Sequence, residues 1–229
     1  MQIVVNHLTR MQPGYVCVAG INVSNGQHVR PVFRHGRLPR DLLTFNGGLF
    51  DIASLVDLGP VKYCGQPPEL EDHSFHFLNA HSIGITSPER FWQMLQDIAR
   101  PSIVEIFGSA IQSFRRGCIV DIGAGKASLG CLIPAAPPTL SVINNGQIRA
   151  EITDGTYTVN LSVTDLRLCE ADHKTPKENL IREINARIQS GTPVILSVGL
   201  TRPWRHSDDI VERHWLQVNN FHLKDNIIW

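Results

Sequence analysis

The stretch GQIRAEITDGTYTVNLSVTDLRL, residues 146–168, decides the fold of the second half of this chain. Apolar and polar residues alternate on both sides of Asp154-Gly155, which is the pattern of two half-buried strands. The apolar set on one face is Ile148, Ala150, Ile152, Tyr157, Val159, Leu161 and Val163. Because Asp-Gly favours a tight turn, the stretch predicts a β-hairpin.

A helix is predicted directly after this hairpin, in TPKENLIREINARIQSG (175–191). Thr175 and Glu178 have the spacing of a capping box, Pro176 suits the first helical position, and Gly191 suits the end. Two strands follow, PVILSVGL (193–200) and HWLQVNNFHL (214–223), and TLSVIN (139–144) supplies an opening strand. Three strands, one helix and two strands is the element order of an OB-fold, a five-stranded Greek-key barrel.

The first half repeats this theme with insertions. Strands are predicted at IVVNHL (3–8), YVCVAGINV (15–23), QHVRPVF (27–33), LFDIASLVDL (49–58) and SIVEIF (102–107). A hairpin turn is expected at Asn25-Gly26, and a helix at SPERFWQMLQDIA (87–99), with Ser87 as its cap.

We therefore predict a mainly β (α+β) protein of two tandem OB-like five-stranded β-barrels, each with one amphipathic helix. The segment 134–138 holds three prolines and is the predicted linker between a first domain, 1–133, and a second, 139–229.

Composition excludes several classes of protein. The 229 residues are 42% hydrophobic and 18% charged, and 21 basic side chains balance 21 acidic ones, which argues against disorder and against non-specific coating of DNA. Five scattered cysteines without a C-x-x-C pair argue against a disulfide framework and a cysteine-based zinc site. No signal peptide or membrane-spanning stretch is apparent, so we expect a cytoplasmic protein that does not engage membranes.

The chain also resembles a known family. The N-terminal NHLTRMQPGYVCVAGINVSNGQHVRPV (6–32) and the C-terminal SVGLTRPW (197–204) and HWLQVNNFHL (214–223) are similar to the hallmark regions of the bacterial dual OB-containing domain. The resemblance spans nearly the whole chain. It implies two tandem OB folds and nucleic-acid binding in prokaryotic conflict and defence systems.

Two stretches carry the residue types that bind nucleic acid. Residues 1–40 contain five arginines and no acid, and guanidinium groups grip phosphate well. The loop and strand near the C-terminus combine tryptophans for base stacking with further arginines and amides. The predicted nucleic-acid-binding residues are Arg10, Arg30, Arg34, Arg37, Arg40, Arg202, Trp204, Arg205, Arg213, Trp215, Gln217 and Asn219.

A non-catalytic protein that binds single-stranded DNA or RNA is the function that these patterns favour. A nucleotide or small-molecule sensor and an adaptor for an effector enzyme are the alternatives, since arginine and tryptophan serve all three. No catalytic motif is present, although a composite site formed on folding stays open, and we expect no cofactor. Asp72, His73 and His76 have a spacing that can hold a metal, but no matching second pair follows, so no metal site is predicted.

Overall fold

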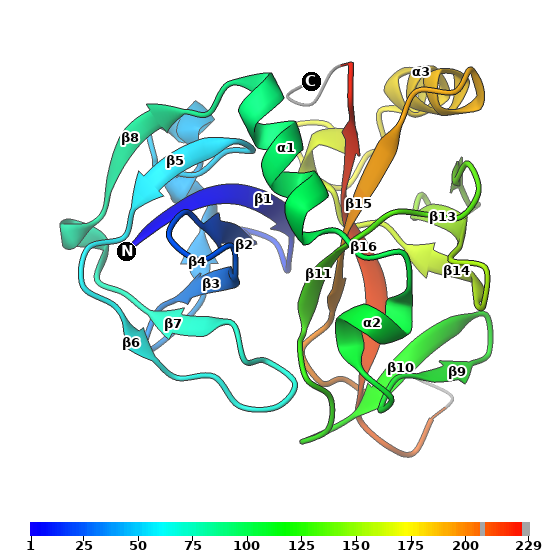
Figure 1. Cartoon of the computed structure of the whole chain (residues 1–229), viewed down its shortest axis with the longest axis horizontal. Helices are drawn as coiled ribbons and strands as arrows, with labels where there is room; N and C mark the ends of the chain where they lie inside the picture. The colour runs from blue at the N-terminus through cyan, green and yellow to red at the C-terminus, as the bar shows by residue number, and fades with distance from the viewer. Residues whose placement is uncertain (207–208, 226–229) are drawn as a thin grey trace.

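The structure, a computed structural model that describes residues 1–206 and 209–225, is mainly β and has two hydrophobic cores side by side (Figure 1). The first unit contains one α-helix, α1 (Pro88–Ile98), and an eight-stranded sheet. Its strands are β1 (Gln2–Arg10), β2 (Tyr15–Asn22), β3 (His28–Val32), β4 (Leu38–Pro39), β5 (Ser54–Asp57), β6 (Lys62–Tyr63), β7 (Asp72–Ser74) and β8 (His81–Ile85).

Strand order in this sheet is β6-β7-β3-β2-β1-β5-β8, with β4 paired to β2. The predicted hairpin between β2 and β3 is confirmed, and Gly26 at its turn has a φ of 72°, which glycine adopts without strain. The predicted cap of α1 is also confirmed, because Ser87 Oγ accepts a hydrogen bond from the backbone N of Arg90 at 3.3 Å.

The second unit contains two helices among the described residues, α2 (Ile103–Phe107) and α3 (Glu178–Gln189). Its strands are β9 (Gln112–Phe114), β10 (Gly117–Asp121), β11 (Leu129–Leu132), β12 (Thr139–Val142), β13 (Ile148–Thr153), β14 (Thr158–Ser162), β15 (Val194–Leu200) and β16 (Arg213–Leu223). They form a five-stranded sheet, β11-β15-β16-β10-β9, and a three-stranded sheet, β12-β13-β14.

The predicted hairpin at 148–162 is confirmed as β13 and β14, which pair antiparallel. The predicted start of the following helix is wrong: α3 begins at Glu178, after Lys177, rather than at Pro176. The Thr175 hydroxyl donates to Asp172 Oδ2 at 2.6 Å, so it belongs to the preceding turn and does not cap the helix.

Residues 102–107 are a second correction, because they form helix α2 rather than a strand. A short apolar run suits either element, and local hydrogen bonds decide here. Ser102 Oγ accepts from the backbone N of Glu105 at 3.3 Å, and Asp154 Oδ2, from the β13–β14 turn, accepts from the backbone N of Ile103 at 2.8 Å. A Cβ atom at Gly130 would lie 2.2 Å from Ile106 Cγ2, so glycine lets α2 pack closely on β11.

Two closed five-stranded barrels are not formed by the described residues, and this part of the prediction is corrected. The long strands β15 and β16 pair with β11 and β10 instead, so the sheet recruits strands from residues 112–132. Buried side chains of α2, β10 and β11 lie in the second core. The division at residues 134–138 stays a prediction.

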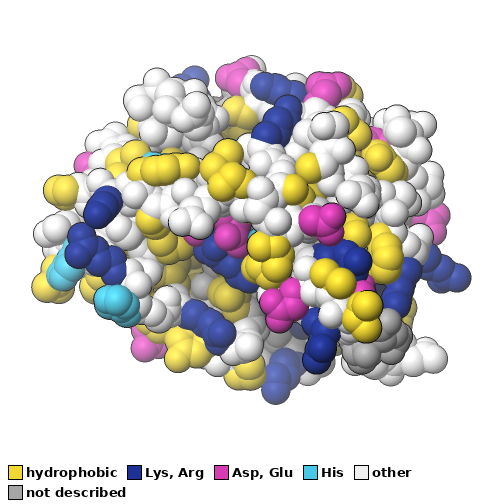
Figure 2. All heavy atoms as spheres, turned by 90° about the horizontal axis from the view of Figure 1, so that it is seen from below, with side chains coloured by type: hydrophobic (Ala, Val, Ile, Leu, Met, Phe, Trp, Pro, Cys, Tyr) yellow, Lys and Arg dark blue, Asp and Glu magenta, His cyan; other side chains and the backbone are white. Residues whose placement is uncertain are grey.

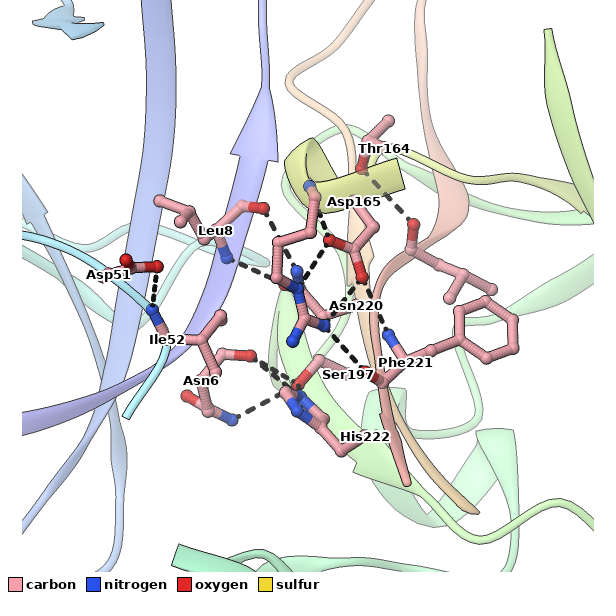
Figure 3. A network of polar contacts seen from close by, with 12 residues as sticks. Asn6, Leu8, Asp51, Ile52, Thr164, Asp165, Ser197, Asn220, Phe221 and His222 are labelled. Carbon is pink, nitrogen blue, oxygen red and sulfur yellow. Dashed lines mark hydrogen bonds and ion pairs between the residues drawn. The ribbon is translucent and has the colours of Figure 1, made fainter. Parts of the chain in front are cut away.

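Strand β1 joins the two units, and residues 3–9 are buried along their whole length. Figure 3 shows Asn6 and Leu8 of β1 facing β15 and β16. The backbone N of Leu8 donates to Asn220 Oδ1 at 2.8 Å, and Ser197 Oγ donates to the Asn6 carbonyl at 2.8 Å. Side chains of β15 and β16 therefore hydrogen-bond to the backbone of β1 and connect the two units. Within the described residues, no helix is long and apolar enough to cross a membrane.

Candidate nucleic-acid interface

A groove of about 1030 Å³ lies between the β1–β2 turn of the first unit and strands β10, β14 and β16 of the second. We call it the basic groove. Its lining includes one described carboxylate, Asp172. Six cationic side chains line it: Arg10, Arg40, Arg115, Arg116, Arg149 and Lys174. Anionic ligands are therefore the class that this groove suits.

Four rings form an aromatic cluster in the lining: Phe114, Trp204, His206 and Trp215. The ring centroids of Trp204 and Trp215 are 5.5 Å apart with a 37° angle between the planes, and His206 lies 5.7 Å from Trp204. Phe114 meets Trp215 edge to face at 5.7 Å. Trp204 keeps 43% of its surface exposed, so the cluster presents a ring to the groove for stacking.

Two arginines of the groove, Arg40 and Arg149, are held by neutral hydrogen-bond partners. Arg40 Nη2 donates to the Ala171 carbonyl at 3.0 Å, and Arg149 donates to Asn160 Oδ1 at 2.8 Å and to Ser162 Oγ at 2.7 Å. Within residues 1–206 and 209–225, neither of these two nor Arg10 or Arg116 forms an ion pair. Their positive charge is oriented but is not cancelled by a described carboxylate.

The carboxylate of Asp172 accepts hydrogen bonds from its own turn. The Thr175 hydroxyl, followed by the backbone N–H groups of Lys174 and Thr175, donates hydrogen bonds that lower the pKa of Asp172 to about 2. Asp172 therefore stays anionic, and the six cationic side chains of the groove lining outnumber it.

Five of the twelve predicted binding residues line the basic groove: Arg10, Arg40, Trp204, Trp215 and Gln217. Arg37 lies beside it, with its guanidinium carbon 5.8 Å from the centroid of the Tyr15 ring and a hydrogen bond to Gln12. The guanidinium carbon of Arg213 lies 5.2 Å from the centroid of the Phe114 ring. The same side chain forms ion pairs with Asp121 and Asp209.

The other predicted residues lie elsewhere. Arg34 lines a separate pocket of the first unit, Arg205 is exposed outside the groove lining, and Asn219 is buried against His7. Arg30 and Arg202 pair with acids from residues 69–72, a cluster that we call the carboxylate hub and define as Arg30, Arg202, Glu69, Glu71 and Asp72. For all twelve residues, a role in binding stays a prediction.

Within the hub, Arg30 Nε lies 2.5 Å from Asp72 Oδ1, and Arg202 lies 2.8 Å from Glu69 Oε1 and 2.7 Å from Asp72 Oδ2. Glu71 accepts hydrogen bonds from the backbone N and hydroxyl of Ser128 at 2.9 and 2.6 Å. The hub thus ties the first unit to the second. Figure 2, which views the molecule from the side of β6 and β10, shows basic and acidic side chains interspersed across this face.

Sequence reasoning missed Phe114, Arg115, Arg116 and Arg149. A signal was present in the first three, because Phe-Arg-Arg at 114–116 puts a ring beside two cations. Arg149 carries no such signal, since it follows the ordinary alternation of a half-buried strand. Asp72 of the Asp72, His73 and His76 set is engaged in the hub, and His73 Nδ1 lies 2.9 Å from the Glu71 carbonyl.

Comparison with known proteins gives one family and distant structural likenesses. The profile of the family described as "Dual OB-containing domain" matches residues 1–221. No curated protein matches the chain. Among solved structures, a murine DNA-binding protein bound to double-stranded DNA is 9% identical with a TM-score of 0.33, covering 97% of each chain. The p204 HINb domain is 11% identical with a TM-score of 0.37, covering 95% of each chain.

Proposed function

The chain belongs to the dual OB-containing domain family, and on that premise we propose that its basic groove binds single-stranded nucleic acid. OB folds grip oligonucleotides on a strand face and its neighbouring loops. The groove is built in this way, from the faces of β10, β14 and β16 and from the loop that carries Trp204.

One observation carries the proposal: cations without described ion pairs lie beside an exposed ring cluster. Phosphates would pair with Arg10, Arg40, Arg116 and Arg149, while a base stacks on Trp204. Stacking needs an unpaired base with an open face, which favours a single strand over a duplex. The neutral net charge of the chain confines the attraction to this groove.

The test is fluorescence anisotropy with a labelled single strand of about 20 nucleotides, measured from low to moderate salt. Four phosphate contacts predict a slope of log K against log salt of roughly −3, or about a 50-fold loss of affinity between 50 and 200 mM salt. Arg116→Ala should weaken binding, and Arg182→Ala, an exposed arginine of α3 outside the groove lining, is the matched control. Equal affinity at both salt concentrations would refute the electrostatic capture.

A nucleotide sensor is the second candidate, supported by the size of the groove. About 1030 Å³ lies at the upper end of the volumes of small-ligand pockets. The length of the ligand separates the two candidates. A sensor saturates with a mononucleotide, whereas a strand binder gains affinity as nucleotides are added and loses it when the strand is paired into a duplex.

A further inference from the structure

Two histidines and a cysteine meet where the two units join, away from the groove lining. His7 lies on β1, His28 on β3 and Cys131 on β11, and one donor atom from each lies within 4.8 Å of the others. Cys131 Sγ is 3.9 Å from His28 Nε2, and the centroids of the two imidazole rings are 5.0 Å apart. Imidazole nitrogen and thiolate sulfur are the donors that zinc prefers.

Two polar atoms in and beside this cluster lack a hydrogen bond. His7 Nε2 and Asn6 Oδ1 are buried, and neither has a hydrogen-bond partner among the described residues. A buried polar atom without a hydrogen-bond partner destabilises the folded state. The Asn6 amide nitrogen lies in the midst of the cluster, 3.1 Å from His28 Nε2 and 3.4 Å from Cys131 Sγ. A half-turn of this amide directs Oδ1, a ligand atom, to the place where the nitrogen lies.

We propose that His7, His28 and Cys131 bind one Zn²⁺ ion, with Asn6 Oδ1 as the fourth ligand. Zn–N bonds of about 2.0–2.1 Å and a Zn–S bond of about 2.3 Å require the donor atoms to approach one another by up to about 1.5 Å. His28 is half-buried, whereas His7 and Cys131 are buried, so the ion enters past His28. This inference is independent of nucleic-acid binding.

The two imidazoles have the protonation state that a metal site needs, and the thiol reaches it by losing a proton. Burial lowers the pKa of His7 well below its ordinary value and that of His28 to about 4, so both rings are neutral and can offer a lone pair. Burial raises the pKa of the Cys131 thiol to about 12. The thiol must lose its proton when the sulfur binds zinc, so each ion that binds releases about one proton at neutral pH.

Two amides beside His7 can reorient when an ion binds and still keep the hydrogen bonds that link them to His7 and to each other. The Asn219 amide nitrogen donates to His7 Nδ1 at 2.9 Å, and Gln217 Nε2 donates to Asn219 Oδ1 at 2.9 Å. If His7 binds through Nε2, its proton moves to Nδ1, and half-turns of both amides reverse and keep both bonds. Because Gln217 lines the basic groove, this chain of amides connects the two sites.

The experiment is a titration of the EDTA-treated full chain with Co²⁺ as a spectroscopic probe and with Zn²⁺ by calorimetry in two buffers. We expect one ion per chain, a sulfur-to-cobalt charge-transfer band, about one proton released per ion and a higher Tm with zinc. The near-isosteric Cys131→Ser should lose the band, and Cys64→Ser, at an exposed cysteine, should keep it.

The circular dichroism spectrum and Tm of each metal-free variant establish that it is folded. If Cys131→Ser does not fold, His28→Gln decides, because His28 is partly exposed and its loss should reduce affinity for Co²⁺ at least tenfold. A folded wild-type chain without a charge-transfer band, or a band that persists in folded Cys131→Ser, would overturn the proposal.

Discussion

The carboxylate hub and the basic groove both contain arginines, but these arginines have different kinds of partner. In the hub, Arg30 and Arg202 pair with Asp72 and Glu69 at 2.5 to 2.8 Å. In the groove, Arg40 and Arg149 donate to carbonyl, amide and hydroxyl oxygens, which orient a guanidinium group without neutralising it. Arg202, which pairs with carboxylates of the first unit, helps to hold the two units together, whereas arginines with neutral partners suit an anionic ligand.

Two arginines that the sequence predicts alike, Arg30 and Arg40, have different partners in the structure. Arg30 and Arg40 both belong to the acid-free stretch 1–40 and are ten positions apart. The fold brings Asp72 to Arg30 through the parallel pairing of β3 with β7, while it brings the backbone of Ala171 to Arg40. Whether an arginine pairs with a carboxylate thus depends on what the fold places beside it.

Removing a hub arginine should have the largest effect. Arg30→Ala leaves Asp72 buried with only part of its compensation, and breaking a buried pair costs about 3–5 kcal/mol. We expect this loss in the free energy of unfolding from urea titration, with unchanged affinity of the folded protein for the single strand. Arg34→Ala, at an exposed neighbour, is the control. Unaltered stability together with weaker binding would return Arg30 to the ligand-binding set.

Acid should destabilise the junction between the units, while the arginines of the groove keep their positive charge. Burial lowers the pKa of His7 and His222 well below 6.5, so both rings stay neutral in the folded chain while their unfolded counterparts take up protons. The unfolded state then binds more protons, and stability falls as the pH falls through 6.5. Between pH 7 and pH 5 the loss should be about 2 kcal/mol for each histidine.

Urea unfolding of the metal-free chain at pH 7, 6 and 5 measures this dependence. His222→Gln should reduce its steepness by about one proton, and His81→Gln, at an exposed position, should leave it unchanged. A free energy of unfolding that is flat over this range would mean that the two histidines are protonated or accessible in the folded state.

The ring cluster should contribute the next largest effect, on binding alone. Trp204→Ala removes the exposed stacking surface, which is worth about 1–3 kcal/mol, so affinity for the single strand should fall about 5- to 150-fold. The Tm should change little. Tyr63→Ala, an exposed aromatic residue on β6 outside the groove lining, should leave the affinity unaltered. Equal losses in both variants would point to non-specific aromatic contacts.

A single groove arginine should have the smallest effect, seen most clearly in the salt dependence. Arg116→Ala removes one phosphate contact, so the slope of log K against log salt should become shallower by about 0.7. Arg202→Ala should leave this slope unchanged if the hub keeps that side chain away from phosphate. A shallower slope for Arg202→Ala would erase the distinction between hub and groove.

Local patterns were sufficient for much of the fold. Alternation at residues 148–163 gave the β13–β14 hairpin, and Ser87 gave the start of α1, because these signals act between residues close in the chain. Patterns failed where a partner that the pattern does not include takes a group, whether that partner is three residues away or 51. Asp172 engages Thr175 and delays α3, and Asp154 holds the N-terminus of α2, where an apolar run alone resembles a strand.

The sequence by itself determined a mainly β chain whose family match spans residues 1–221, and it placed Trp204, Trp215 and Arg40 among the candidate ligand contacts. Only the tertiary structure decided that Arg30 and Arg202 pair with carboxylates, that Arg149 joins Arg10 in one groove, and that His28 meets Cys131 from 103 positions away. The physical reason is the separation along the chain between the residues that interact. Periodicity and capping depend on neighbours within a few residues, whereas ion pairing, groove lining and metal coordination depend on side chains that strand pairing brings together from across the chain.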